Sequence, residues 1–196
     1  MYIFLSCWLP SVRPMTTTKT LQAIHSVDVI AFLSIVQWNT RRRIRVLANV
    51  VSSSADGWSY LLVPLVIALV SPELGWTVFV TLLAGFTIER PAYYLLKNGF
   101  KRNRPPMIIP GFQSVITASD EFSFPSGHTS GAFVVTTTLM LLMPLGASGF
   151  YLYGWAITVA LSRIVLGVHF PLDTVAGALL GSSIAWAAVQ LMPFHV

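Results

Sequence analysis

Three short segments of this sequence hold most of the side chains that could take part in a reaction. Residues 162–173 have the sequence SRIVLGVHFPLD and place Arg163, His169 and Asp173 at the edge of an uncharged, apolar half of the chain. Residues 97–105 (KNGFKRNRP) and 125–128 (PSGH) have the same character. Ionisable side chains are costly in such apolar surroundings, so their presence indicates a functional site.

The cations and small donors of these segments suit a phosphoryl group. Lys97, Arg104 and Arg163 could form charge-assisted hydrogen bonds with phosphoryl oxygens. Ser126 and Gly127 stand where a helix is expected to begin, and the unpaired N–H groups of a helix start favour an anion. These residues therefore predict a phosphate-binding site.

The histidines and the aspartate predict the chemistry at that site. His169 and Asp173 are four positions apart, about one helical turn, so the carboxylate can hold one imidazole nitrogen and leave the other free. A histidine oriented in this way can act as a nucleophile or base. His128 could protonate the leaving oxygen. The segments are too poor in carboxylates for a two-metal phosphatase, so we expect metal-independent phosphoryl transfer through a phosphohistidine, with no cofactor.

Each of these residues also has a simpler interpretation. A single histidine near a helix end is often a hydrogen-bonded interface residue, and the cations of 97–104 could belong to an ordinary charged loop. Ser126 and Gly127 could only cap a helix. The functional interpretation therefore depends on whether the three segments meet.

Composition identifies the elements that would position these residues. Of the 196 residues, 55% are hydrophobic and 10% are charged, against roughly 25% charged in a soluble domain. The sequence has no Asp, Glu, Lys or Arg in four stretches: 57–72, 74–88, 129–162 and 174–196. Stretches of this length predict an all-α, polytopic bundle of membrane helices. A soluble protein with a very apolar core is the alternative.

The net charge of +5 comes mostly from two loop clusters, which favours phosphate or anionic lipid over nucleic acid as a partner.

About five transmembrane helices are predicted, at 52–71, 76–96, 126–145, 148–168 and 171–192. Residues 21–38 predict an amphipathic helix lying in the membrane interface, with a short span as the alternative. Arg41–Arg45 suit a membrane-surface anchor. The predicted organisation is an N-terminal segment, 1–45, followed by a transmembrane domain, 46–196. No oligomeric state is predicted.

The number of crossings between segments determines which loops share a side of the membrane. Residues 97–104 end the second span, 125–128 begin the third, and 163–173 join the fourth to the fifth. All three therefore lie on one side, which favours a single composite site. Asp56 could cap a helix or point into this site, and both interpretations stay open. Glu89 and Arg90 are expected to be structural or interfacial.

The three segments together resemble the tripartite signature of the type 2 phosphatidic acid phosphatase superfamily. That signature is Lys-x6-Arg-Pro, then Pro-Ser-Gly-His, then Ser-Arg-x5-His-x3-Asp. It matches here at Lys97, Arg104, Pro105; Pro125, Ser126, Gly127, His128; and Ser162, Arg163, His169, Asp173. In order and spacing the resemblance covers about residues 50–192.

The resemblance implies a role for each matching residue. His169 would attack phosphorus, Asp173 would orient it, and His128 would be the general acid. The phosphate would be bound by five residues, Lys97, Arg104, Ser126, Gly127 and Arg163.

The resemblance also implies a membrane lipid phosphatase whose lipid arrives laterally. Undecaprenyl diphosphate is the leading substrate, with phosphatidylglycerol phosphate or phosphatidic acid as alternatives. A soluble haloperoxidase shares the signature, but the long apolar stretches oppose it. A transporter or scaffold that binds anionic lipid without turnover is a further alternative.

Membrane orientation is predicted with two signals in conflict. The resemblance implies a multi-pass protein of the bacterial inner membrane with its site facing the periplasm or the outside. Arg41–Arg45 fall on the same side as the site and, by the positive-inside rule, favour the cytoplasm. We expect the outward orientation.

Overall fold

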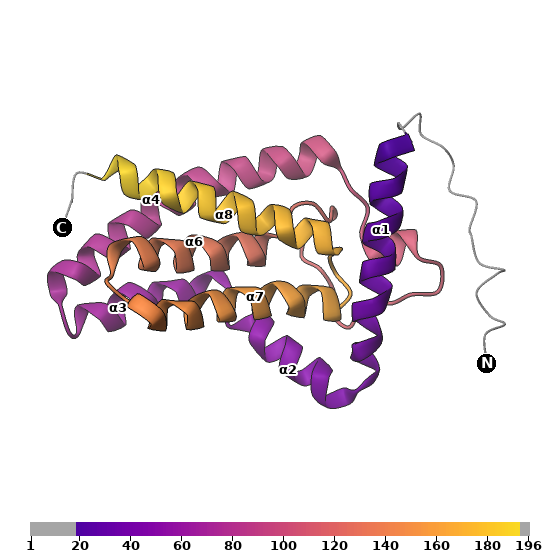
Figure 1. The fold of residues 1–196 in the computed structure, drawn as a ribbon, viewed down its shortest axis with the longest axis horizontal. Coiled ribbons are helices and arrows are strands. Elements are labelled where there is room, and N and C mark those ends of the chain that lie inside the picture. Colours follow the sequence, from indigo (N-terminus) through magenta and orange to yellow (C-terminus); the bar gives the residue numbers. More distant parts are fainter. Residues whose placement is uncertain (1–18, 193–196) are drawn as a thin grey trace.

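The described part of the chain, residues 19–192 of this computed structural model, contains only helical elements (Figure 1). In chain order they are α1 (Lys19–Val36), η1 (Gln37–Thr40), α2 (Arg42–Ser53), η2 (Gly57–Leu61), α3 (Leu62–Ala68), α4 (Pro72–Phe100), α5 (Pro105–Ile108), α6 (Gly127–Leu142), η3 (Gly146–Ser148), α7 (Gly149–Val165) and α8 (Pro171–Leu191). The all-α prediction is thereby confirmed for these residues.

The longer helices form a bundle, and one helix lies across its end. Figure 1 shows α3, α4, α6, α7 and α8 running along a common direction, with α1 crossing the end where α7 joins α8. The most extensive contact is between α6 and α8. On α8, Gly177 and Gly181 face the backbone of α6 so closely that an added Cβ would collide with the carbonyl oxygens of Ser126 and Ser130. Small residues permit this close approach, which places Asp173 of α8 beside the start of α6.

Local signals define the ends of the two helices that carry the first and third segments. At the start of α4, Ser71 Oγ accepts a hydrogen bond from Leu74 N at 3.4 Å, and Pro72 follows in the first turn. The helix ends at Lys101, whose φ of 46° is left-handed. At the start of α8, the Asp173 carboxylate accepts the N–H of Phe170 at 2.8 Å.

The helices occur near the predicted spans, but the first span is not one helix. Residues 52–71 comprise the end of α2, a break, η2 and α3, and the axes of 42–53 and 57–68 differ by 51°. Among the described helices, only α8 is by itself long and apolar enough to cross a membrane. Segments 42–53 and 57–68 meet the same criterion only when they are taken together. The 16 residues of α6 and 17 of α7 are short, and α4 carries charged residues. The count of five spans therefore stays a prediction.

The outer surface of the bundle is apolar. Leu69, Val70, Leu179 and Trp186 are examples of large side chains that are more than half exposed. Water disfavours so many exposed apolar side chains, whereas lipid does not. The surface therefore fits the predicted membrane environment.

A helix, α1, is present near the position predicted for the N-terminal helix, and it packs on the bundle through an aromatic cluster. Apolar side chains such as Val27 and Ile30 are exposed on it, so its predicted amphipathic character is not confirmed. The Phe32 ring of α1 meets Phe112 and Phe170 edge to face, with centroids 5.4 and 5.2 Å apart. Its position in the membrane interface and the division at residue 45 stay predictions. Residues 1–18 lie outside the described part of the chain.

Candidate functional site

The three segments come together at the end of the bundle that α1 crosses (Figure 1). Lys97 lies in the last turn of α4 and Arg104 directly precedes α5. Ser126, Gly127 and His128 lie at the start of α6. Arg163 lies in the last turn of α7. His169 lies in the short connection to α8, and Asp173 lies in the first turn of that helix.

Two cations of the first segment converge on one carboxylate that the sequence did not identify, Asp120. Lys97 Nζ donates to its Oδ2 and Arg104 Nη2 donates to its Oδ1, and the Tyr93 hydroxyl also donates to Oδ2. Burial alone would raise the pKa of Asp120, but the hydrogen bonds from Lys97 and Tyr93 and the charges of both cations lower it to about 2. A carboxylate therefore occupies a place whose donors suit a phosphoryl group.

Arg104 also connects this place to the nucleophile candidate. Its Nη1 donates to the Val168 carbonyl at 2.6 Å, and its Nε donates to the Asp120 carbonyl at 3.0 Å. Val168 directly precedes His169 in the chain. Arg104 therefore holds the Asp120 loop against the backbone that carries His169.

His169 is almost fully buried, and one of its nitrogens faces a hydroxyl and a carboxylate. Its Nδ1 lies 3.5 Å from Ser123 Oγ and 3.8 Å from Asp173 Oδ2. The distance to Asp173 is longer than a direct hydrogen bond, and Ser123 donates to the same Asp173 oxygen. Burial, with a contribution from Arg104 and Arg163, lowers the pKa of His169 to about 4, although Asp173 opposes this change. The imidazole is therefore neutral at neutral pH, and Nε2 is the nitrogen directed away from Asp173.

Asp173 is the centre of a buried network that reaches the N-terminal helix. Arg102 donates to Asp173 Oδ1 at 2.6 Å and to Asp28 Oδ2 of α1 at 2.5 Å. Asp28 also accepts the backbone N–H of Leu172 at 2.9 Å. Both carboxylates are buried, so each needs these partners. No pattern in the sequence indicates a role for Asp28 or Arg102.

The second segment places its histidine beside Asp56. His128 Nε2 lies 3.0 Å from Asp56 Oδ1, and the Asp56 side chain makes no capping hydrogen bond to η2. Of the two open interpretations of Asp56, the structure favours contact with the site. Ser126 is buried, and its backbone N–H donates to the Asp173 carbonyl at 2.9 Å. Gly127 packs under the Tyr93 ring, where a Cβ would lie 3.0 Å from a ring carbon.

Arg163 is buried and retains an unsatisfied donor. Its Nη1 donates to Ser52 Oγ at 2.6 Å, whereas its Nε has no hydrogen-bond partner among residues 19–192. Buried donors without a partner are rare in folded proteins. The arrangement suits an anion that would accept from Nε.

Residues of the loop between α4 and α6, together with Asp28 of α1, complete the site, and no sequence pattern identified them. Asp120, Ser123, Arg102 and Asp28 each contact a predicted site residue or its direct partner. One signal was available, because Asp120 and Glu121 are the only acids in the loop that carries the predicted cations. The predicted Glu89–Arg90 pair is present, with Glu89 buried and Arg90 exposed.

Two solved structures share this fold. LpxE from Aquifex aeolicus superposes with a TM-score of 0.66 at 22% identity, over 84% of this chain and 95% of that protein. The first transmembrane PAP2-type phosphatidylglycerolphosphate phosphatase from Bacillus subtilis superposes with a TM-score of 0.67 at 21% identity, over 88% and 90%. The bundle therefore has the fold of PAP2-type membrane proteins.

Sequence comparison identifies the family itself. The model of the PAP2 superfamily matches residues 73–196, and the chain belongs to that superfamily. An undecaprenyl-diphosphatase of Sulfolobus acidocaldarius is 29% identical over 140 residues, which are 70% of this chain and 66% of the relative. A probable lipid phosphate phosphatase beta of Arabidopsis thaliana is 31% identical over 152 residues, 64% of this chain and 70% of the relative. Asp28 and Asp56 lie before the region that the family model matches.

Proposed function

We propose that this protein is an integral membrane phosphatase that hydrolyses a lipid diphosphate or lipid phosphate through a phosphohistidine, without a metal ion. Membership of the PAP2 superfamily supports the reaction class. Undecaprenyl diphosphate is the leading substrate, supported by the undecaprenyl-diphosphatase of Sulfolobus acidocaldarius among the relatives. Phosphatidylglycerol phosphate and phosphatidic acid are the alternative substrates.

The convergence of Lys97 and Arg104 on the Asp120 carboxylate is the observation that supports this proposal most directly. Two cations of one motif meet at one anion, and Arg104 connects that anion to the residue before His169. A phosphoryl group that displaced Asp120 would find charge-assisted donors already in place. The unsatisfied Nε of Arg163 would supply another donor.

In the proposed mechanism His169 attacks phosphorus, and His128 acts first as general acid and then as general base. His169 Nε2 forms a bond to phosphorus while the bond from phosphorus to the leaving oxygen breaks. The electron pair of the broken bond goes to that oxygen, and His128 donates a proton to it. Water then attacks phosphorus while the bond from phosphorus to Nε2 breaks and returns its electron pair to that nitrogen. His128 takes up the water proton, and inorganic phosphate leaves. Asp173 and Ser123 face Nδ1 and would hold the ring during both steps.

The proposed orientation places the site on the outer side of the bacterial inner membrane. The family resemblance implies the outward orientation, whereas the positive charge of Arg41–Arg45 favours the cytoplasm. Those arginines lie at the start of α2. The whole of that helix precedes residue 73, where the match to the family model begins.

Phosphate release from purified protein in mild detergent, with EDTA present, tests the proposal. The substrates are undecaprenyl diphosphate, phosphatidylglycerol phosphate and phosphatidic acid, and His169→Ala is assayed in parallel. We expect release by the wild type and a loss of at least about 10³-fold in the variant, because the nucleophile is removed. No release from any substrate, or equal release by the variant, would move lipid binding without turnover ahead of this proposal.

A further inference from the structure

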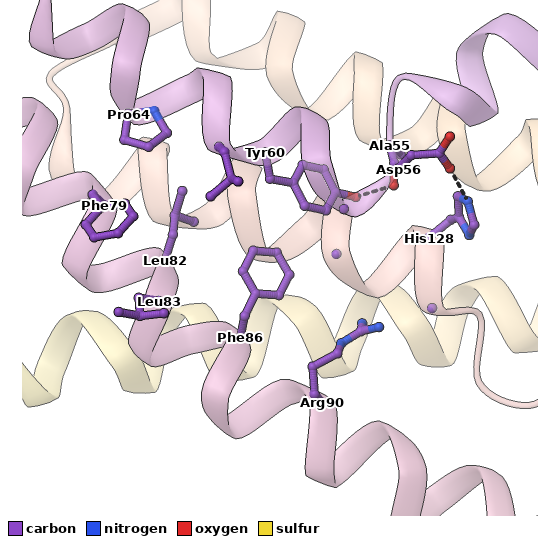
Figure 2. A pocket seen from close by; sticks show the side chains of 14 residues that line it. Ala55, Asp56, Tyr60, Pro64, Phe79, Leu82, Leu83, Phe86, Arg90 and His128 are labelled. Atoms are coloured by element: carbon purple, nitrogen blue, oxygen red, sulfur yellow. Dashed lines mark hydrogen bonds and ion pairs between the residues drawn. The ribbon is translucent and has the colours of Figure 1, made fainter.

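A pocket beside His128 is apolar at one end and polar at the other. Its volume is about 370 Å³, within the range of small-molecule sites, and its walls come from η2, α3, α4 and α6. Figure 2 shows Pro64, Phe79 and Leu83 at the apolar end, and Arg90 and His128 toward the other. A lipid leaving group that passes His128 would therefore find an apolar space for the first part of its tail.

Arg90 is the only Arg or Lys among the residues that line this pocket, and four of its five N–H donors are uncommitted. Its Nε pairs with the buried Glu89 carboxylate, which also accepts Ser130 Oγ at 2.6 Å. Its guanidinium carbon lies 4.9 Å from the centroid of the Tyr93 ring. Its two Nη groups make no hydrogen bond within residues 19–192, and the side chain is 46% exposed. Glu89 and Tyr93 thus hold the Arg90 guanidinium group in place, while the N–H groups of its two Nη atoms stay available for an anion.

The position of Arg90 relative to Lys97 fits two linked phosphates. The two residues are seven positions apart on α4, so they project from the same face of the helix. Both cations lie by the Tyr93 ring, Lys97 Nζ at 4.5 Å from its centroid, which places the two charges within about 9 Å of each other. Two linked phosphates can bridge such a gap with N–H···O bonds of about 2.8 Å at each end.

We propose that Arg90 binds the phosphate that remains on the lipid, so the pocket selects a lipid diphosphate over a lipid monophosphate. This inference rests on the proposed phosphatase function. His169 would attack the terminal phosphorus, and the bond from that phosphorus to the bridging oxygen would break. The bridging oxygen would take the electron pair and a proton from His128. The product, a lipid monophosphate, would stay paired with Arg90 until it leaves through the apolar pocket.

The ratio of two activities measured on the same sample tests this role. Farnesyl diphosphate and farnesyl phosphate have the same tail and differ by one phosphate. In Arg90→Gln we expect kcat/KM for the diphosphate to fall about 10- to 100-fold, because the variant loses hydrogen bonds to a charged phosphate. We expect kcat/KM for the monophosphate to fall less than about threefold. Lys101→Gln removes an exposed cation just beyond the end of the same helix and should leave the ratio unchanged.

Arg90 also neutralises a buried carboxylate, so its loss could destabilise the fold. The double variant Glu89→Gln/Arg90→Gln removes that carboxylate charge together with the cation, and the same change in ratio is expected. The ratio does not depend on the fraction of folded enzyme. Equal losses on both substrates would show that Arg90 only supports Glu89, and this would overturn the inference while the phosphatase function stands. A wild type that cleaves the monophosphate alone would also overturn it. A wild type that releases phosphate neither from the two farnesyl substrates nor from the three lipids of the first assay would remove the proposed function itself.

Discussion

Asp120 is predicted to compete with phosphate for the two cations of the first motif. Lys97 and Arg104 each donate to this carboxylate, so an incoming phosphoryl group has to displace it. Asp120→Asn keeps the shape of the side chain and removes its charge. If Asp120 is a competitor, its neutralisation should tighten the binding of inorganic phosphate, the second product of the proposed reaction.

The size of the effect follows from the electrostatics of the pair. The pKa of Asp120, lowered to about 2 from 3.8, corresponds to at most about 2.5 kcal/mol in favour of the charged form. The side chain is 34% exposed, so solvent screening reduces the usable part to about 1 kcal/mol. One kcal/mol is about a fivefold change in an equilibrium constant, and we therefore expect the inhibition constant of phosphate to fall about fivefold.

Product inhibition at fixed pH and ionic strength measures this change. Inorganic phosphate is titrated against hydrolysis of a lipid diphosphate by the wild type, Asp120→Asn and Glu121→Gln. Glu121 is the exposed neighbour, so its variant removes the same charge without touching the cations. An inhibition constant that stays the same or rises in Asp120→Asn would refute the reasoning, because Asp120 would then position Lys97 and Arg104 for phosphate instead of competing with it.

Two further predictions concern the N-terminal helix and the orientation. Asp28→Asn should lower kcat by about tenfold and lower Tm, because breaking a buried ion pair is strongly destabilising and Arg102 would hold Asp173 less firmly. The exposed Ser34→Ala on the same helix is the control, and wild-type kcat and Tm in Asp28→Asn would contradict the coupling. Thr117→Cys, made with Cys7→Ser, should react with a membrane-impermeant thiol reagent in intact cells because Thr117 is exposed in the site loop; protection from the reagent would reverse the proposed orientation.

The positions of the later helices could be predicted from the sequence because uncharged apolar stretches mark them. The region expected at 76–96 lies within α4, and the regions expected at 148–168 and 171–192 contain α7 and α8. The break within the first predicted span could not be predicted, since the apolar composition continues across it. The break is at residues 54–56, between α2 and η2, and hydropathy does not record it.

The motif residues could be predicted, but most of their partners could not. Lys97, His128 and His169 lie in short patterns with fixed spacing, and the structure brings them to one end of the bundle. Arg102 and Asp173 are 71 positions apart, and only the path of the loop brings them together. No local pattern encodes such a pairing.

The docking of α1 has a consequence for biogenesis. Asp28 bonds to the N–H of Leu172, 144 positions later, and to Arg102, 74 positions later. A chain emerges from the ribosome N-terminus first, so Asp28 has no native partner until the loop is made and lacks its full set until α8 begins. Contacts of such long sequence separation form late, because the intervening chain has to be ordered first. The helix made first among those described is thus secured last, and a nascent chain that stops before α8 cannot assemble the proposed active site.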